Sequence, residues 1–187
     1  MRWTLAFLIA LACVAPSSIA PTTTVSLWLS DPPRLPGQIC VQGILVDSAP
    51  AYGQSCGHTP GTVNHLDRVI RHTYLQQTAF SGGLTVTGGT VHLSLWHPLV
   101  PLPHPLMLVN ATLDMQDGSA HRRIANGSLL CPTPTVFAGT WICDVPLVVT
   151  HGTVPSGSTL RLNVTWQRDE HAFSPVIEYG ADGSRLD

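Results

Sequence analysis

The chain has 187 residues, of which 44% are hydrophobic and 11% are charged, so it can bury a core and is not a disordered polyampholyte. Its formal net charge is −2 and its nine Arg and Lys residues are scattered, which excludes the basic face that binds nucleic acid. Its 16 Gly and 16 Pro residues favour many short elements joined by turns over long helices.

Residues 1–20 have the pattern of a secretory signal peptide. The basic start Met1-Arg2 precedes an apolar run from Trp3 to Val14, which is too short to span a membrane comfortably. We therefore predict a secreted, extracellular protein. The stretch before Cys13 also loosely resembles a bacterial lipobox, so a lipid anchor at Cys13, at a bacterial cell surface or in the periplasm, is the alternative. No second apolar stretch of about 20 residues follows, and no transmembrane segment is expected.

The next 60 residues are expected to contain a stalk, a strand, a loop and a helix. Residues 21–38 are rich in Pro and Thr and predict a stalk, whereas residues 39–47, ICVQGILVD, predict a strand followed by a loop. In residues 62–80, Val63, Leu66 and Tyr74 recur at helical spacing. This spacing predicts one short helix that ends at Gly82-Gly83.

The chain from Gly83 onward is expected to be β-structure. Alternating apolar residues on both sides of Gly88-Gly89 predict a hairpin. Further strands are predicted in residues 105–115, 123–130, 139–150 and 158–167, separated by turn residues. Regularly spaced short strands are typical of an antiparallel β-sandwich. We therefore predict a sandwich domain over residues 39–167 and a polar C-terminal tail over residues 168–187.

Four cysteines remain if Cys13 is removed or lipidated: Cys40, Cys56, Cys131 and Cys143. An even number in an exported chain predicts two disulfides. Three pairings are open, and we favour Cys40–Cys56 with Cys131–Cys143 because each closes a short loop that contains turn residues. A zinc site is the rival interpretation, but the chain has no CxxC pair.

Three of the four asparagines start glycosylation sequons, namely Asn110, Asn126 and Asn163. In a eukaryotic or viral host we expect glycans at these positions. In a bacterial host the same tripeptides are simply compatible with strands.

Residues 105–167 are similar to the last strands of Ig-like repeats in exported surface proteins, because a Cys pair brackets a hairpin and a Gly-Ser turn leads into an alternating final strand. The Tyr that an Ig domain carries two residues before its second Cys is replaced by Trp141. The resemblance implies an antiparallel Ig-like β-sandwich with a role in adhesion, recognition or structure. It implies no catalytic residue.

Two chemical alternatives compete with this interpretation. Gly53-Gln54-Ser55-Cys56-Gly57 matches the GxSxG nucleophile elbow, and Asp114 or Asp144 with His151 or His171 could complete a serine hydrolase. The chain lacks the βαβ alternation that would hold such an elbow. The nine histidines could serve a bacterial metal-handling lipoprotein, but their spacings do not place two of them at one ion.

The sequence therefore predicts an all-β, Ig-like sandwich with one short helix and two disulfides. We expect a secreted or surface-exposed, non-catalytic binding or structural protein that acts through protein–protein contacts with an unidentified partner. We expect no catalytic residue, no metal ligand and no cofactor. The alternatives are a small secreted serine hydrolase acting through Ser55 and a metal-handling lipoprotein.

Overall fold

The structure, a computed structural model, describes residues 24–31, 43–51, 53–54, 69–97, 106–132, 139–167 and 176–187. The regular elements in these residues are all strands. The first six are β1 (Leu27–Ser30), β2 (Gly43–Val46), β3 (Gly53–Gln54), β4 (Val69–Gln76), β5 (Leu84–Thr85) and β6 (Gly89–His97). The others are β7 (Leu106–Asp117), β8 (Ala120–Pro132), β9 (Gly139–Val149), β10 (Thr153–Val154), β11 (Thr159–Gln167), β12 (Val176–Tyr179) and β13 (Arg185–Leu186).

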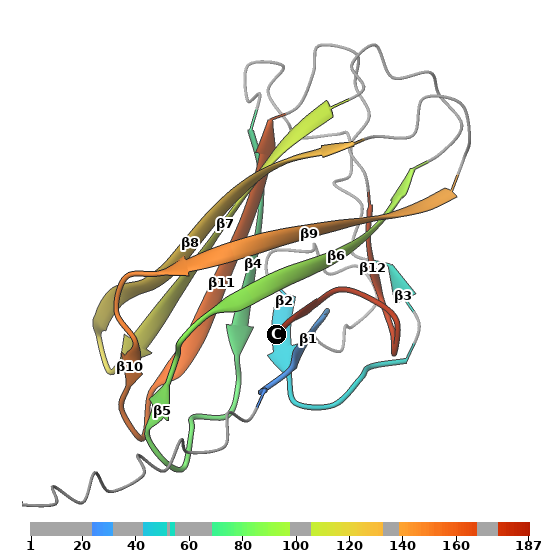
Figure 1. Ribbon diagram of the computed structural model, residues 1–187. Coiled ribbons are helices and arrows are strands. Elements are labelled where there is room, and N and C mark those ends of the chain that lie inside the picture. The colour runs from blue at the N-terminus through green and yellow to red at the C-terminus, as the bar shows by residue number, and fades with distance from the viewer. Residues whose placement is uncertain are drawn as a thin grey trace, which may run out of the picture.

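Nine of these strands form one closed sheet. The hydrogen-bonded order is β13-β1-β2-β4-β11-β7-β8-β9-β6, and β6 pairs again with β13, so the ring closes (Figure 1). The strand pairs are antiparallel except β2 with β4, which is parallel. β12 pairs with β6 and carries β3 on its other side, while β5 and β10 form a separate two-stranded ribbon at one end of the barrel.

The barrel core follows from the two-residue alternation of the long strands. In β9, Cys143, Val145 and Leu147 are buried and the residues between them are exposed. β11 turns Leu160, Leu162, Val164 and Trp166 inward in the same way. Each such large side chain contributes about 1.5–3 kcal/mol when fully buried, and together these side chains fill the interior of the closed sheet.

The seam between β8 and β9 is one of the short joints of the ring. These strands pair only at Ala125 with Val149 and at Asn126 with Val148. The next position along β8 is Gly127, where a Cβ atom would overlap the carbonyl oxygen of Pro146. Pro146 also has no N–H to donate to a ladder. Beyond this point the disulfide Cys131–Cys143 joins the two strands.

Several sequence predictions need correction against this fold. The chain is all-β, but it forms a closed barrel and not an Ig-like sandwich, because β13 pairs with both β1 and β6 and leaves no two separate sheets. Residues 69–76 of the predicted helix form β4, which is held by β11 on one side and β2 on the other. The predicted hairpin at Gly88-Gly89 does not form, because β5 pairs with β10.

The predicted domain bounds and disulfides also differ from the structure. β1 lies in the predicted stalk, and β12 and β13 lie in the predicted tail, so the sheet extends beyond residues 39–167. The described residues contain one disulfide, Cys131–Cys143, where two were predicted. Cys40 and Cys56 lie outside the described residues. The described part of the chain also contains no helix with the length and apolar character needed to cross a membrane.

Candidate functional site: a pocket beside a His–Asp pair

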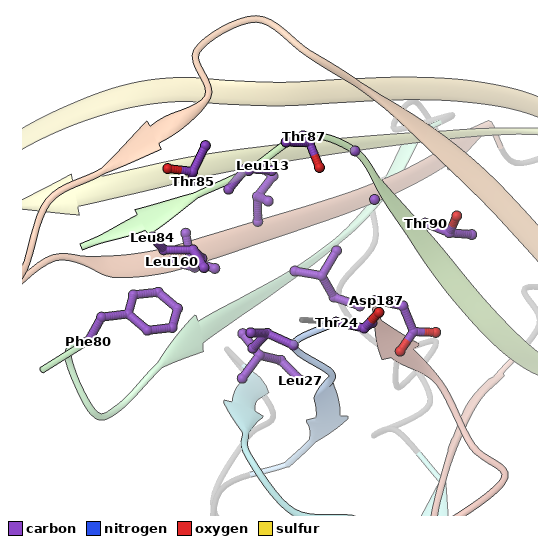
Figure 2. A pocket seen from close by; sticks show the side chains of 15 residues that line it. Thr24, Leu27, Phe80, Leu84, Thr85, Thr87, Thr90, Leu113, Leu160 and Asp187 are labelled. Atoms are coloured by element: carbon purple, nitrogen blue, oxygen red, sulfur yellow. The ribbon is translucent and has the colours of Figure 1, made fainter. Parts of the chain in front are cut away.

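A pocket with a volume of about 310 Å³ opens at the end of the barrel that carries the β5–β10 ribbon (Figure 2). Its apolar walls come from Leu27, Phe80, Leu84, Val86, Leu113 and Leu160. Leu113 and Leu160 belong to neighbouring strands of the closed sheet, β7 and β11, and both are buried. The pocket is therefore an extension of the barrel core that reaches the surface.

The loop that forms one wall is fixed by backbone hydrogen bonds. The N–H of Phe80 donates to the carbonyl of Ser158 at 3.0 Å, and the N–H of Gly157 donates to the carbonyl of Phe80 at 2.8 Å. The N–H of Val86 donates to the carbonyl of Gly152 at 2.7 Å. These bonds hold the apolar side chains of residues 80–86 over the open end of the barrel, so the pocket is preformed.

The other end of the pocket is polar. Thr24, Thr90 and Asp187 line it, and Figure 2 shows these three grouped together, away from Phe80, Leu84 and Thr85. The Asp187 carboxylate accepts hydrogen bonds from Ser26 Oγ at 2.7 Å and from Arg185 Nε at 2.8 Å. The carboxylate is therefore already paired where it faces the pocket.

A histidine and an aspartate form a close pair on the outer face of the barrel. His92 on β6 lies directly opposite Asp144 on β9, and His92 Nδ1 is 2.6 Å from Asp144 Oδ1. The His92 side chain is 17% exposed and the Asp144 side chain is 57% exposed. An ionised carboxylate can only accept, so the Nδ1 atom carries the proton and donates it to Asp144. In the neutral imidazole with its hydrogen on Nδ1, the Nε2 atom has a lone pair.

The His–Asp pair lies close to the polar end of the pocket. Thr90, which lines the pocket, precedes His92 by two residues on β6. Residues two apart on a strand point to the same face and lie about 6.5–7 Å apart along it. The main chain of Thr90 also exchanges two hydrogen bonds with that of Asp187, at 2.8 and 2.9 Å. Thr90 therefore connects the pocket with the outer face of β6 that carries His92, although His92 itself does not line the pocket.

A second polar cluster on the same face is structural. The buried carboxylate of Glu178 accepts hydrogen bonds from Thr140 Oγ1 at 2.6 Å and from Ser94 Oγ at 3.1 Å. Ser184 Oγ in turn accepts from the main-chain N–H of Ser94 at 2.9 Å. These bonds fasten β12 and the following turn to β6 and β9. A buried carboxylate would be costly without them.

Two tyrosines form a third buried network. Tyr74 Oη lies 3.4 Å from Tyr179 Oη, and Tyr179 Oη donates to Asp31 Oδ1 at 3.0 Å. Burial raises the pKa of both phenols well above the ordinary value of 10, and the Asp31 charge raises them further. Both tyrosines therefore stay protonated, and the network links β4 and β12 to the end of β1.

The structure separates the residues that the sequence singled out as sites. Ser55 and His171 lie outside the described residues. Asp114 accepts a hydrogen bond from Arg123 Nε at 2.8 Å, whereas Asp144 pairs with His92 and not with His151. Among the described residues no group of three or more His, Cys, Asp or Glu side chains could hold a metal ion.

The three sequon asparagines lie on the outer face of the sheet in different surroundings. Asn163 accepts from Thr73 Oγ1 at 2.8 Å and donates to Asp114 Oδ2 at 3.3 Å. Asn110 accepts from Ser128 Oγ at 2.7 Å. The Asn126 side chain is exposed.

Sequence analysis missed both the pocket and the His92–Asp144 pair. The pair joins residues that are 52 positions apart, and it depends on the register between β6 and β9. The alternating patterns of these strands were visible in the sequence, but their register was not. The pocket collects residues from β1, β5, β7 and β11 and from the chain end near β13, so no local motif could reveal it.

Comparison with known proteins links the fold to hydrolases. No family model matches the chain, and no curated protein matches it. Among solved structures, an α-amino acid ester hydrolase is similar, with a TM-score of 0.51 and 10% identity over 87% of this chain. A CocE/NonD family hydrolase from Staphylococcus aureus, with 12% identity over 87% of this chain, and an aminopeptidase from the marine sediment archaeon Thaumarchaeota archaeon, with 9% over 86%, score 0.49 and 0.47.

This likeness is one of fold. The chain spans 35% of the ester hydrolase, 36% of the CocE/NonD hydrolase and 35% of the aminopeptidase. The closed ring of strands and the similar fold of the ester hydrolase correct the Ig-like resemblance. The predictions of a non-catalytic binding or structural protein and of a chain that is not an enzyme find no support in this likeness, because the similar structure with a TM-score of 0.51 is that of an ester hydrolase.

Proposed function

We propose that this chain hydrolyses ester bonds, with His92 as the general base and the adjacent pocket as the site for an apolar group of the ester. The fold shared with an ester hydrolase supports the reaction class. Because one fold can host unrelated activities, this support is an analogy and assigns no residue. The observation that carries the proposal is the His92–Asp144 pair, which lies one strand repeat from the pocket.

The geometry of the pair suits proton transfer from water. Asp144 holds the Nδ1–H tautomer of His92, as the carboxylate does in other His-dependent hydrolases. Nε2 can then accept a proton from a water molecule while the water oxygen attacks the ester carbonyl carbon. The bond from that carbon to the leaving oxygen breaks, and the leaving alkoxide takes the proton from Nε2. The products are one carboxylic acid and one alcohol.

The rate expected from this arrangement is modest. A positioned general base contributes about 10²–10⁴-fold over the uncatalysed reaction. Within the part of the chain that the structure describes, no serine or cysteine side chain contacts the His92 ring, so water is the nucleophile in this proposal. We therefore expect slow turnover of activated esters and no covalent acyl intermediate.

Hydrolysis of 4-nitrophenyl octanoate by the purified full chain tests this proposal. We expect release of 4-nitrophenol at about 10²–10⁴ times the buffer rate. The His92→Ala variant is expected to hydrolyse the ester at the buffer rate. The Asp144→Asn variant is expected to be at least tenfold slower than wild type, because asparagine does not hold His92 in the Nδ1–H tautomer. His121→Ala is the matched control, since His121 is exposed on β8, and it should keep full activity.

Two results would refute the proposal. The first is a wild-type rate no higher than that of buffer. The second is equal activity in wild type and His92→Ala prepared in parallel, which would assign the activity to another residue or to a contaminant.

A further inference from the structure

We propose that the pocket at the β5–β10 end binds an unbranched aliphatic chain of roughly eight to ten carbons. Identification of this chain as part of an ester rests on the proposed function, whereas the binding of the chain does not. The argument draws on the volume, the wall chemistry and the polar end of the pocket.

The volume limits the size of the ligand. At about 30 Å³ for each water-sized group, a pocket of about 310 Å³ holds about ten such groups. This volume lies at the low end of the range of about 300–1,000 Å³ for small-molecule sites. A chain of roughly eight to ten carbons fills it, and a larger ligand must extend into solvent.

The walls select an aliphatic occupant. Leu27, Leu84, Val86, Leu113 and Leu160 supply branched aliphatic surface, and Phe80 closes one end. In Figure 2 the labelled side chains extend from Phe80 and Leu84 past Leu113 and Leu27 to Thr90 and Asp187. This elongated arrangement matches an extended chain with its methyl end at Phe80.

The polar end selects an uncharged head group. The Asp187 carboxylate lines that end and accepts from Ser26 and Arg185, so the Arg185 guanidinium is already engaged and an anionic head would meet a carboxylate there. Thr24 and Thr90 supply hydroxyl groups at this end that can donate to or accept from an ester or alcohol oxygen. Under the proposed function, an ester group at this end must extend past Thr90 toward His92, about 6.5–7 Å along β6, and a free carboxylate product would be bound less tightly than the ester.

Titration of the full chain with 1-alkanols tests the proposal without any hydrolysis. Because burial of one methylene tightens binding about fourfold, affinity should rise about fourfold per carbon from 1-butanol to about 1-decanol and then level off. The readouts are isothermal titration calorimetry and backbone amide shifts. In the wild-type protein the amides of residues 80–90 and of Leu113 and Leu160 should shift.

Filling the pocket supplies the matched variant. Leu84→Trp is expected to weaken 1-octanol binding at least tenfold, whereas Leu130→Trp should leave it unchanged because Leu130 is 56% exposed on β8 and does not line the pocket. Sodium octanoate should bind more weakly than 1-octanol. If Leu84→Trp fails to fold, the shift map of the wild-type protein still decides the question.

The outcomes separate the two proposals. Chain-length-dependent binding of alkanols without hydrolysis of octanoate esters would support the pocket and refute the hydrolase. Hydrolysis with affinities that do not depend on alkanol length, or with shifts spread over other faces, would overturn the pocket proposal and leave the hydrolase standing.

Discussion

Removal of the Cys131–Cys143 disulfide should loosen the β8–β9 seam and destabilise the barrel by about 3 kcal/mol. The two cysteines are separated by 12 positions. The chain-entropy relation for a loop of that length gives an entropy change near −9.5 cal/mol/K, or about 2.8 kcal/mol at 25 °C. The seam adds to the effect because only two residue pairs of β8 and β9 are in register there.

The double variant Cys131→Ala/Cys143→Ala is suitable because both side chains are buried and alanine introduces no unsatisfied polar atom. In urea unfolding, the variant should reach its midpoint at a lower urea concentration than wild type. In thermal unfolding, a loss of about 3 kcal/mol corresponds to a fall of roughly 6–12 °C in Tm for a chain of this size. Wild-type protein treated with a reductant should behave like the variant. A loss of less than about 1 kcal/mol in both samples would refute the claim that this disulfide stabilises the seam between β8 and β9.

Three further predictions concern the core, the surface and the pH response. Gly43→Ala should lower the free energy of unfolding by about 1–3 kcal/mol, because the added Cβ would overlap the Tyr74 ring. Gly139→Ala should leave it unchanged, since no atom lies within 4 Å of the position of its Cβ. Thermal melts of the two variants compare these effects directly. If the protein is exported by a glycosylating host, Asn126 should carry the glycan with the highest occupancy because it is exposed, and peptide mass spectrometry showing an unmodified Asn126 would contradict this. Burial raises the pKa of Tyr74 and Tyr179 in the folded protein, so the unfolded chain loses these protons first as the pH rises above 10. The free energy of unfolding should therefore fall above pH 10 by about 1.4 kcal/mol per pH unit for each tyrosine. A free energy of unfolding that is equal at pH 9 and pH 11 would show that neither phenol has a raised pKa.

The strands were the most predictable part of the fold. Buried and half-buried residues alternate strictly over residues 109–116 and 159–166, and this two-residue period is visible in the sequence. The turns were also predictable from their residues. Gly118 and Gly157 adopt φ values of +57° and +86°, a region that glycine occupies without strain.

The helix prediction failed because the residue spacing in β4 suits both structures. Ile70 and Tyr74 are four residues apart, as on one face of a helix, but Tyr74 packs inward opposite Leu162 because β11 pairs with β4 from Val69 to Leu75. Pairing with a strand 90 residues away outweighs local propensity, as is common for β-structure. A single sequence does not contain the information that β11 is the partner.

The closure of the barrel and the site escaped prediction for a related reason. β13 contains only Arg185 and Leu186, yet it closes the ring by pairing with both β1 and β6. Two residues are too few to show the alternation of apolar and polar residues that predicts a strand. The same register problem hid the site, since His92 and Asp144 meet only because β6 and β9 are aligned at that position.

The most direct test of the central claim is the dependence of kcat/KM on acyl length for 4-nitrophenyl esters from butanoate to dodecanoate. The wild-type chain should show an increase of about fourfold per carbon until the pocket is full at roughly eight to ten carbons. Leu84→Trp should show no such increase, and His92→Ala should stay at the buffer rate for every ester. A wild-type value that does not change with acyl length, or a His92→Ala profile equal to that of wild type, would contradict a single site built from the pocket and the His92–Asp144 pair.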